Sequence, residues 1–115
     1  MKLRTLAIAG VLAAAMGAGP TLAAELLFPS MSYRTGPYAP NGIPVADGYA
    51  DYFTLLNERD GGIGGVMTKV EECETGYNTE KGVECYESVK GKNPTVINPW
   101  STGITLQLIP KAGVV

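Results

Sequence analysis

The chain has 115 residues, enough for one small domain, and it contains two cysteines and no histidine. A serine–histidine–aspartate triad, a cysteine–histidine pair and a histidine-ligated zinc site are therefore excluded within the chain. Nine basic and eleven acidic residues give a net charge of −2, without the basic cluster that nucleic acid binding requires. No phosphate-binding loop or EF-hand pattern is present, so neither a cofactor nor a metal is expected.

Residues 1–23 have the three parts of a secretory signal peptide. Lys2 and Arg4 are followed by an apolar run over 6–16 and by small residues that end in Thr21-Leu22-Ala23. Cleavage is expected after Ala23, with Ala24 as the alternative position, which makes residues 24–115 the exported protein. The alternative, a membrane anchor, is disfavoured because the apolar run is shorter than the ~20 residues that span a bilayer. Loss of the two leader cations brings the net charge to −4.

The first unit of the exported chain is a strand from Leu27, a loop over 32–42 and a helix over 43–59. Apolar residues recur at helical spacing on one face of that helix, and Phe53 is expected in the core. Glycines 61 and 62 end the helix. Tyr33, Arg34 and Tyr38 in the loop could face a ligand. Alternatively, the two tyrosines pack the loop against its own helix.

The second unit is a strand over 66–72, with one partly apolar face typical of an edge strand, and a helix over 79–90. Asn78 or Thr79 can cap this helix, and Val83, Tyr86 and Val89 form its inward stripe. Carboxylates such as Glu71, Glu72, Glu84 and Glu87 are expected to be solvated. Because the chain is exported and has two cysteines close in sequence, a Cys73–Cys85 disulfide is predicted; the alternative is two reduced, buried thiols.

A third strand over 95–98 leads into a third helix that starts near Ser101 or Thr102 and carries Ile104, Leu106, Leu108 and Ile109. Three strand–helix units predict an α/β fold, a partial doubly wound parallel sheet in the order 2-1-3. Ligands of such sheets bind where the first and third strands end.

Two loops should meet at that place, residues 33–41 and 100–105. Ser101, Thr102 and Thr105 bring hydroxyls, and unpaired amides near the start of the third helix favour a carboxylate. Trp100 and Tyr38 bring flat apolar walls. The alternative is that Ser101 or Thr102 is only an N-cap and that Trp100 is a core residue.

The residues Thr35-Gly36-Pro37, Gly61-Gly62-Ile63-Gly64-Gly65, the stretch 72–87 and the stretch 101–105, in this order after a signal peptide, resemble one family. It is the periplasmic substrate-binding proteins of branched-chain amino acid-type ABC transporters, which have the type I periplasmic binding fold. The resemblance implies a two-lobed receptor that closes around a small molecule and presents it to an inner-membrane permease. It assigns ligand contacts to Tyr38, Asn41, Trp100, Ser101 and Thr102, and the hydroxyl of Thr105 adds a sixth candidate. Trp100 is bulky for a leucine site, which leaves aromatic acids, amides and urea-like ligands open.

The chain departs from that family in length, since members are several times longer. Residues 24–115 are therefore expected to be an incomplete N-terminal lobe of a periplasmic receptor, inactive or weakly binding alone. The second hypothesis is a small stand-alone exported interaction protein with one disulfide. An enzyme is not expected, because the chain lacks histidine and no nucleophile elbow surrounds Ser101.

Overall fold

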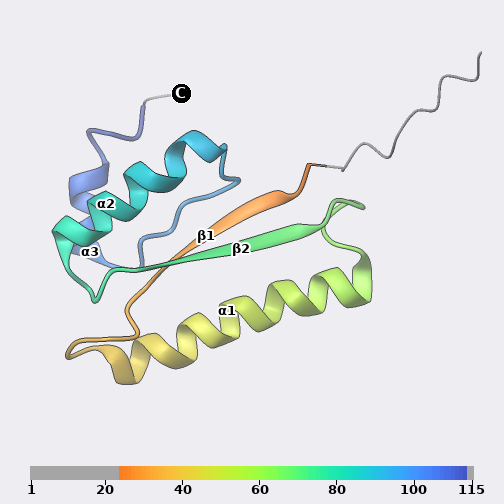
Figure 1. Cartoon of the computed structure of the whole chain (residues 1–115), viewed down its shortest axis with the longest axis horizontal. Helices are drawn as coiled ribbons and strands as arrows, with labels where there is room; N and C mark the ends of the chain where they lie inside the picture. The colour runs from red at the N-terminus through yellow and green to blue at the C-terminus, as the bar shows by residue number, and fades with distance from the viewer. Residues whose placement is uncertain (1–23, 114–115) are drawn as a thin grey trace, which may run out of the picture.

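A computed structural model describes residues 24–113 of the chain, as two layers of helices around a short parallel sheet (Figure 1). The signal peptide predicted for residues 1–23 lies outside the described residues. Over residues 24–113, none of the helices has the length and hydropathy that crossing a bilayer demands.

The sheet consists of β1 (Leu26–Ser32) and β2 (Thr68–Glu74), paired in parallel with Leu26 opposite Thr68 and Ser32 opposite Glu74. The second strand was predicted two residues too early. Asn57 fixes the first residue of β2, because its side-chain amide donates to the Thr68 carbonyl (2.7 Å) and accepts from the Thr68 N–H (2.8 Å). Immediately before β2, the chain makes a turn that is closed by a β-bridge between Ile63 and Val66.

The long helix α1 (Ala39–Asp60) covers one face of the sheet (Figure 1). It begins four residues before the predicted start, since Pro40 is tolerated in the first turn and Pro44 does not interrupt the helix. Phe53 is 8% exposed and stacks on Phe28 of β1, with ring centroids 4.3 Å apart, which confirms its place in the core. Gly61 ends the helix in the left-handed conformation, as the sequence predicted.

The other face of the sheet is covered by α2 (Thr79–Val89), which continues as one 3-10 turn (Lys90–Lys92), and by α3 (Thr102–Leu108). The Asn78 side chain caps α2 by accepting from the Lys81 N–H, as predicted. The core on this side comprises Met31, Cys85, Tyr86, Ile104 and Leu108. Leu106 and Ile109 of the predicted third helix remain more than 60% exposed.

The predicted third strand is not formed among the described residues, where 95–98 makes only one parallel bridge, between Ser30 and Asn98. The Thr95 N–H also donates to the Leu27 carbonyl, so the segment does lie on the expected side of β1. The backbone N–H of Leu26 points toward β2. Because backbone groups alternate sides along a strand, the N–H and C=O groups of the odd-numbered residues of β1 point toward residues 95–98. Pro29 is one of them and has no N–H, which removes a hydrogen bond from this ladder.

Candidate functional site

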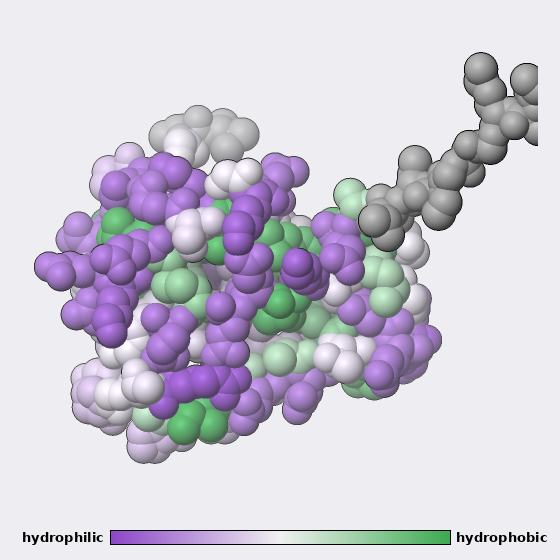
Figure 2. All heavy atoms as spheres, viewed as in Figure 1, coloured by the Kyte–Doolittle hydropathy of each residue, from purple (hydrophilic) through white to green (hydrophobic). Residues whose placement is uncertain are grey.

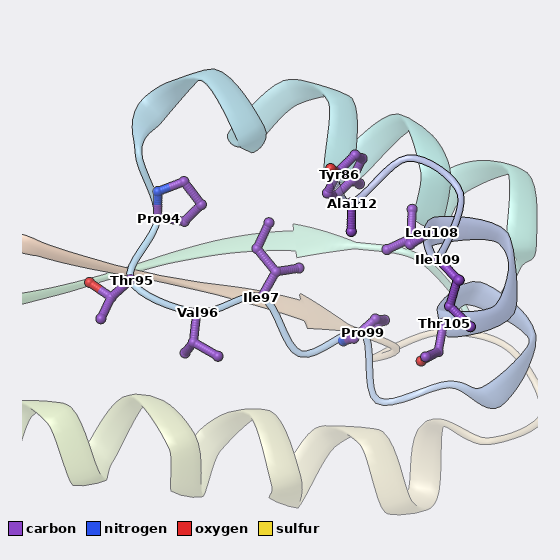
Figure 3. A pocket seen from close by; sticks show the side chains of 10 residues that line it. All are labelled: Tyr86, Pro94, Thr95, Val96, Ile97, Pro99, Thr105, Leu108, Ile109 and Ala112. Carbon is purple, nitrogen blue, oxygen red and sulfur yellow. The ribbon is translucent and has the colours of Figure 1, made fainter. Parts of the chain in front are cut away.

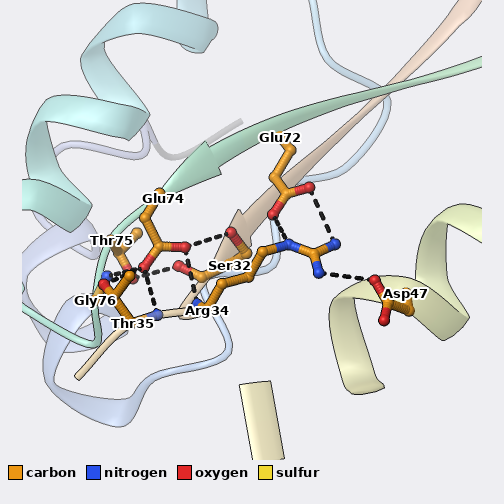
Figure 4. Close-up of polar contacts among 8 residues, drawn as sticks. All are labelled: Ser32, Arg34, Thr35, Asp47, Glu72, Glu74, Thr75 and Gly76. Atoms are coloured by element: carbon orange, nitrogen blue, oxygen red, sulfur yellow. Dashed lines mark hydrogen bonds and ion pairs between the residues drawn. The ribbon is translucent and has the colours of Figure 1, made fainter. Parts of the chain in front are cut away.

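A polar cluster fixes the ends of the two strands and the loop that leaves β1 (Figure 4). The Glu74 carboxylate accepts hydrogen bonds from the Ser32 hydroxyl (3.0 Å), the Arg34 N–H (2.8 Å) and the Gly76 N–H (2.9 Å). Both the N–H and the hydroxyl of Thr35 also donate to it. One carboxylate thus joins the β1–α1 loop to the β2–α2 loop.

Arg34, which could face a ligand according to the sequence, is engaged by two carboxylates of the protein itself. Its guanidinium pairs with Glu72 of β2 and, at 2.7 Å, with Asp47 of α1, so it links three elements (Figure 4). Both carboxylates raise the pKa of Arg34, and the Arg34 hydrogen bond lowers the pKa of Glu72. Glu72 and Asp47 are thus exposed to solvent and also paired with Arg34. Glu71 likewise pairs with Lys92, and Glu87 with Lys90 and Lys111, through partly exposed side chains.

The hydrogen bonds of Glu74 predict a pH dependence of stability. Desolvation raises the pKa of Glu74, but the hydrogen bonds from Arg34, Thr35 and Ser32 outweigh it and hold the pKa below 4.5. The stabilisation is thus complete above pH 4.5 and is lost as the pH falls through the lowered pKa. Chemical denaturation at several pH values should show that Glu74→Gln weakens this acid dependence and lowers stability at neutral pH. Glu58→Gln, on the exposed side of α1, is the control, and an equal effect of both variants would contradict the prediction.

Two hollows accompany α3, and they differ in chemistry. The larger, of ≈ 390 Å³, is apolar and lies between α2, α3 and residues 94–99, with Val96, Ile97, Leu108 and Ile109 among its walls (Figure 3). Figure 2 shows hydrophobic atoms lying open between the helices and the strands. The smaller hollow, of ≈ 320 Å³, is lined by Tyr77, Asn98, Trp100, Ser101, Thr102, Thr105 and Leu106. We take the smaller one as the candidate site because it combines hydroxyls with flat rings.

Four of the six predicted ligand contacts therefore share one pocket: Trp100, Ser101, Thr102 and Thr105. Their hydroxyls are not equivalent. Ser101 Oγ caps α3 by accepting from the Ile104 N–H (3.4 Å), and Thr105 Oγ1 donates to the Ser101 carbonyl (2.8 Å). Within residues 24–113, the Thr102 hydroxyl has no hydrogen-bond partner, which leaves it as the hydroxyl most available to a solute.

The other two predicted contacts lie on the β1–α1 loop side. Tyr38 is 51% exposed and packs against Tyr77, with ring centroids 4.5 Å apart. Asn41 is exposed in the first turn of α1 and is not part of the pocket wall. Ligand binding by these six residues stays a prediction.

Tyr77 lines the pocket and was not singled out in the sequence. It follows β2, and sequence reasoning assigned the site only to the loops after the first and third strands. The Gly76-Tyr77-Asn78 turn could have indicated this residue, because loops that follow strands often carry binding residues.

The second predicted feature of this region is the disulfide. Cys73 of β2 and Cys85 of α2 are bonded, with Cα atoms 5.8 Å apart. The alternative of two reduced thiols does not hold in the structure. Because Cys85 belongs to the core cluster, the bond ties the strand end beside Glu74 to the helix that supports α3.

Comparison with known proteins gives a family match and a solved relative. The profile of the periplasmic binding protein family matches residues 28–113. A solved structure described as an ABC transporter permease from the Pseudomonas fluorescens group is 38% identical, with a TM-score of 0.73. The match covers 76% of this chain and 22% of that chain, so the present chain spans less than a quarter of its length. No curated protein matches significantly.

Proposed function

Because the chain belongs to the periplasmic binding protein family, we propose that it is part of the solute-binding component of an ABC importer. The solutes are branched-chain or related amino acids, amides or urea-like molecules, and the partner of the complete receptor is an inner-membrane permease. The predicted signal peptide and the family match both support a periplasmic location. The resemblance to a transporter component supports this function over a stand-alone interaction protein.

The observation that carries the proposal is the pocket at the carboxyl-terminal side of the sheet. Trp100 supplies a flat wall, and the N-terminal turn of α3 supplies the Thr102 hydroxyl and the amides of Thr102 and Gly103, which have no acceptor among the described residues. Such donors suit a carboxylate or a carbonyl oxygen. Ser101 and Thr105 position this turn through their hydrogen bonds.

Residues 24–115 are, in this proposal, an incomplete N-terminal lobe. The open apolar hollow beside residues 94–99 supports this, because exposed apolar surface of this kind is ordinarily covered by further elements of a domain. The coverage of only 22% of the solved relative supports it as well. A receptor that closes around its ligand needs both lobes, so the affinity of this chain is expected to be low.

Isothermal titration calorimetry of the exported chain tests the proposal with leucine, an aliphatic amide, urea and benzoate. We expect dissociation constants in the millimolar range, and micromolar binding would contradict the incomplete lobe. Thr102→Val should weaken binding about threefold to tenfold, the size of one lost hydrogen bond. Thr54→Val on the exposed side of α1 is the control, because the Thr54 hydroxyl only donates to the Ala50 carbonyl. Equal binding by both variants would remove Thr102 from the site.

A further inference from the structure

Two aromatic residues of the candidate site have backbone conformations that bulky side chains rarely adopt. Tyr77 has a φ of +62° and Trp100 a φ of +49°, and both line the smaller hollow. The remaining non-glycine residue with positive φ in the described chain is Asn93, a residue type that adopts this conformation readily. The two unfavourable conformations thus coincide in one pocket, and such strain is concentrated at functional sites.

The backbone around Tyr77 is held in place by several hydrogen bonds. The Tyr77 N–H donates to the Thr75 hydroxyl (3.1 Å), which itself donates to the Ser32 carbonyl (2.8 Å). The Asn78 N–H donates to the Thr75 carbonyl (2.9 Å), and Thr75 is fully buried. The turn is therefore fixed to the end of β1, which sets the direction of the Tyr77 side chain.

Each of the two rings is also supported by other aromatic rings. Tyr33 meets Tyr77 edge to face at 5.1 Å, and Tyr38 packs on it at 4.5 Å. Tyr49 of α1 meets Trp100 edge to face at 5.0 Å. Among the residues that the structure describes, the Tyr77 hydroxyl makes no hydrogen bond. Both rings are thus held in position by the protein before a solute binds, and the Tyr77 hydroxyl remains without a partner among the described residues.

We propose that Tyr77 contacts the solute and, together with Trp100, selects a molecule with a planar aromatic body. This inference rests on the proposed solute-binding function and specifies one property of the solute, a planar aromatic ring. Pre-positioned rings favour a planar partner, because stacked and edge-to-face contacts add to simple apolar burial. A hollow of ≈ 320 Å³ is at the small end of ligand pockets and suits a single ring.

The test compares benzoate with cyclohexanecarboxylate, two acids of similar size that differ in planarity. Trp100 is the only tryptophan of the chain, so its fluorescence reports directly on the pocket. Titrations of the exported chain at millimolar acid should show tighter binding of benzoate. Tyr77→Gly removes the ring and permits the positive φ, and it should reduce the preference for benzoate about threefold to tenfold. Tyr77→Phe retains the ring and should retain the preference.

Tyr52→Ala removes an exposed tyrosine from α1 and is the control for a general loss of aromatic surface. Equal binding of the two acids by the unchanged chain, or an equal loss for both acids in Tyr77→Gly, would overturn the inference. Binding of leucine or an amide in either case would leave the proposed function intact. If none of the acids, leucine, urea or the amide changes the Trp100 emission or gives heat, both proposals fail.

Discussion

Replacing both cysteines, as Cys73→Ser with Cys85→Ser, is expected to lower the free energy of unfolding by about 3 kcal/mol. The bond closes a short loop, with a sequence separation of 12, and its loss gives the unfolded chain more conformations. A small domain with a sheet of two strands has little other stabilisation to replace it. Urea denaturation followed by circular dichroism measures the difference.

Reduction provides the matched control for this pair of substitutions. A reducing agent should destabilise the unchanged chain by a similar amount and should have no further effect on the double variant. Retention of full stability in the double variant would show that packing of Cys85 in the core, and not the covalent bond, supports the fold.

Gly42→Ala is expected to destabilise the chain by about 1–3 kcal/mol, because the first turns of α1 lie directly against the loop after β1. A Cβ atom at this position would lie 2.0 Å from the Tyr33 carbonyl oxygen and 2.8 Å from its carbonyl carbon. Since these are backbone atoms, either the helix or the loop must move. Tyr33 supports Tyr77, so the displacement should also reach the pocket.

Gly48→Ala is the matched control within the same helix, since a Cβ there meets no atom within 4 Å. Alanine is the better helix former, so this variant should gain about 0.5–1 kcal/mol. Thermal unfolding of both variants, with the Trp100 emission recorded alongside, separates a local clash from a general effect of alanine in α1. Similar stabilities for the two variants would contradict the close approach at Gly42.

The features that were predicted correctly depend on residues close together in the chain. The Asn78 cap acts on Lys81, three residues away, and Gly61 ends α1 through its own left-handed conformation. The apolar stripe that includes Phe53 repeats within one helix. The disulfide prediction combined a short separation with export. In each case the pattern and its physical cause lie within a few helical turns.

The candidate site was only partly predictable. The grouping of Trp100, Ser101, Thr102 and Thr105 follows from their closeness in sequence and from the general geometry of parallel sheets. The addition of Tyr77 depends on how far the β2–α2 loop extends toward α3, which the sequence pattern does not fix. Asn41 was expected in the loop after the first strand, and it lies instead in the first turn of α1, outside the pocket wall.

By itself the sequence determined the order of strands and helices, the helix caps, the disulfide and the family resemblance, because local propensities and spacing govern all of them. Only the tertiary structure decided that residues 95–98 form no regular strand, because it places them beside Pro29, which has no N–H to donate. It also decided the internal role of Arg34, which pairs with Glu72 from 38 positions away. Contacts of this kind depend on strand register and packing, and many sequences with the same local pattern could satisfy them differently.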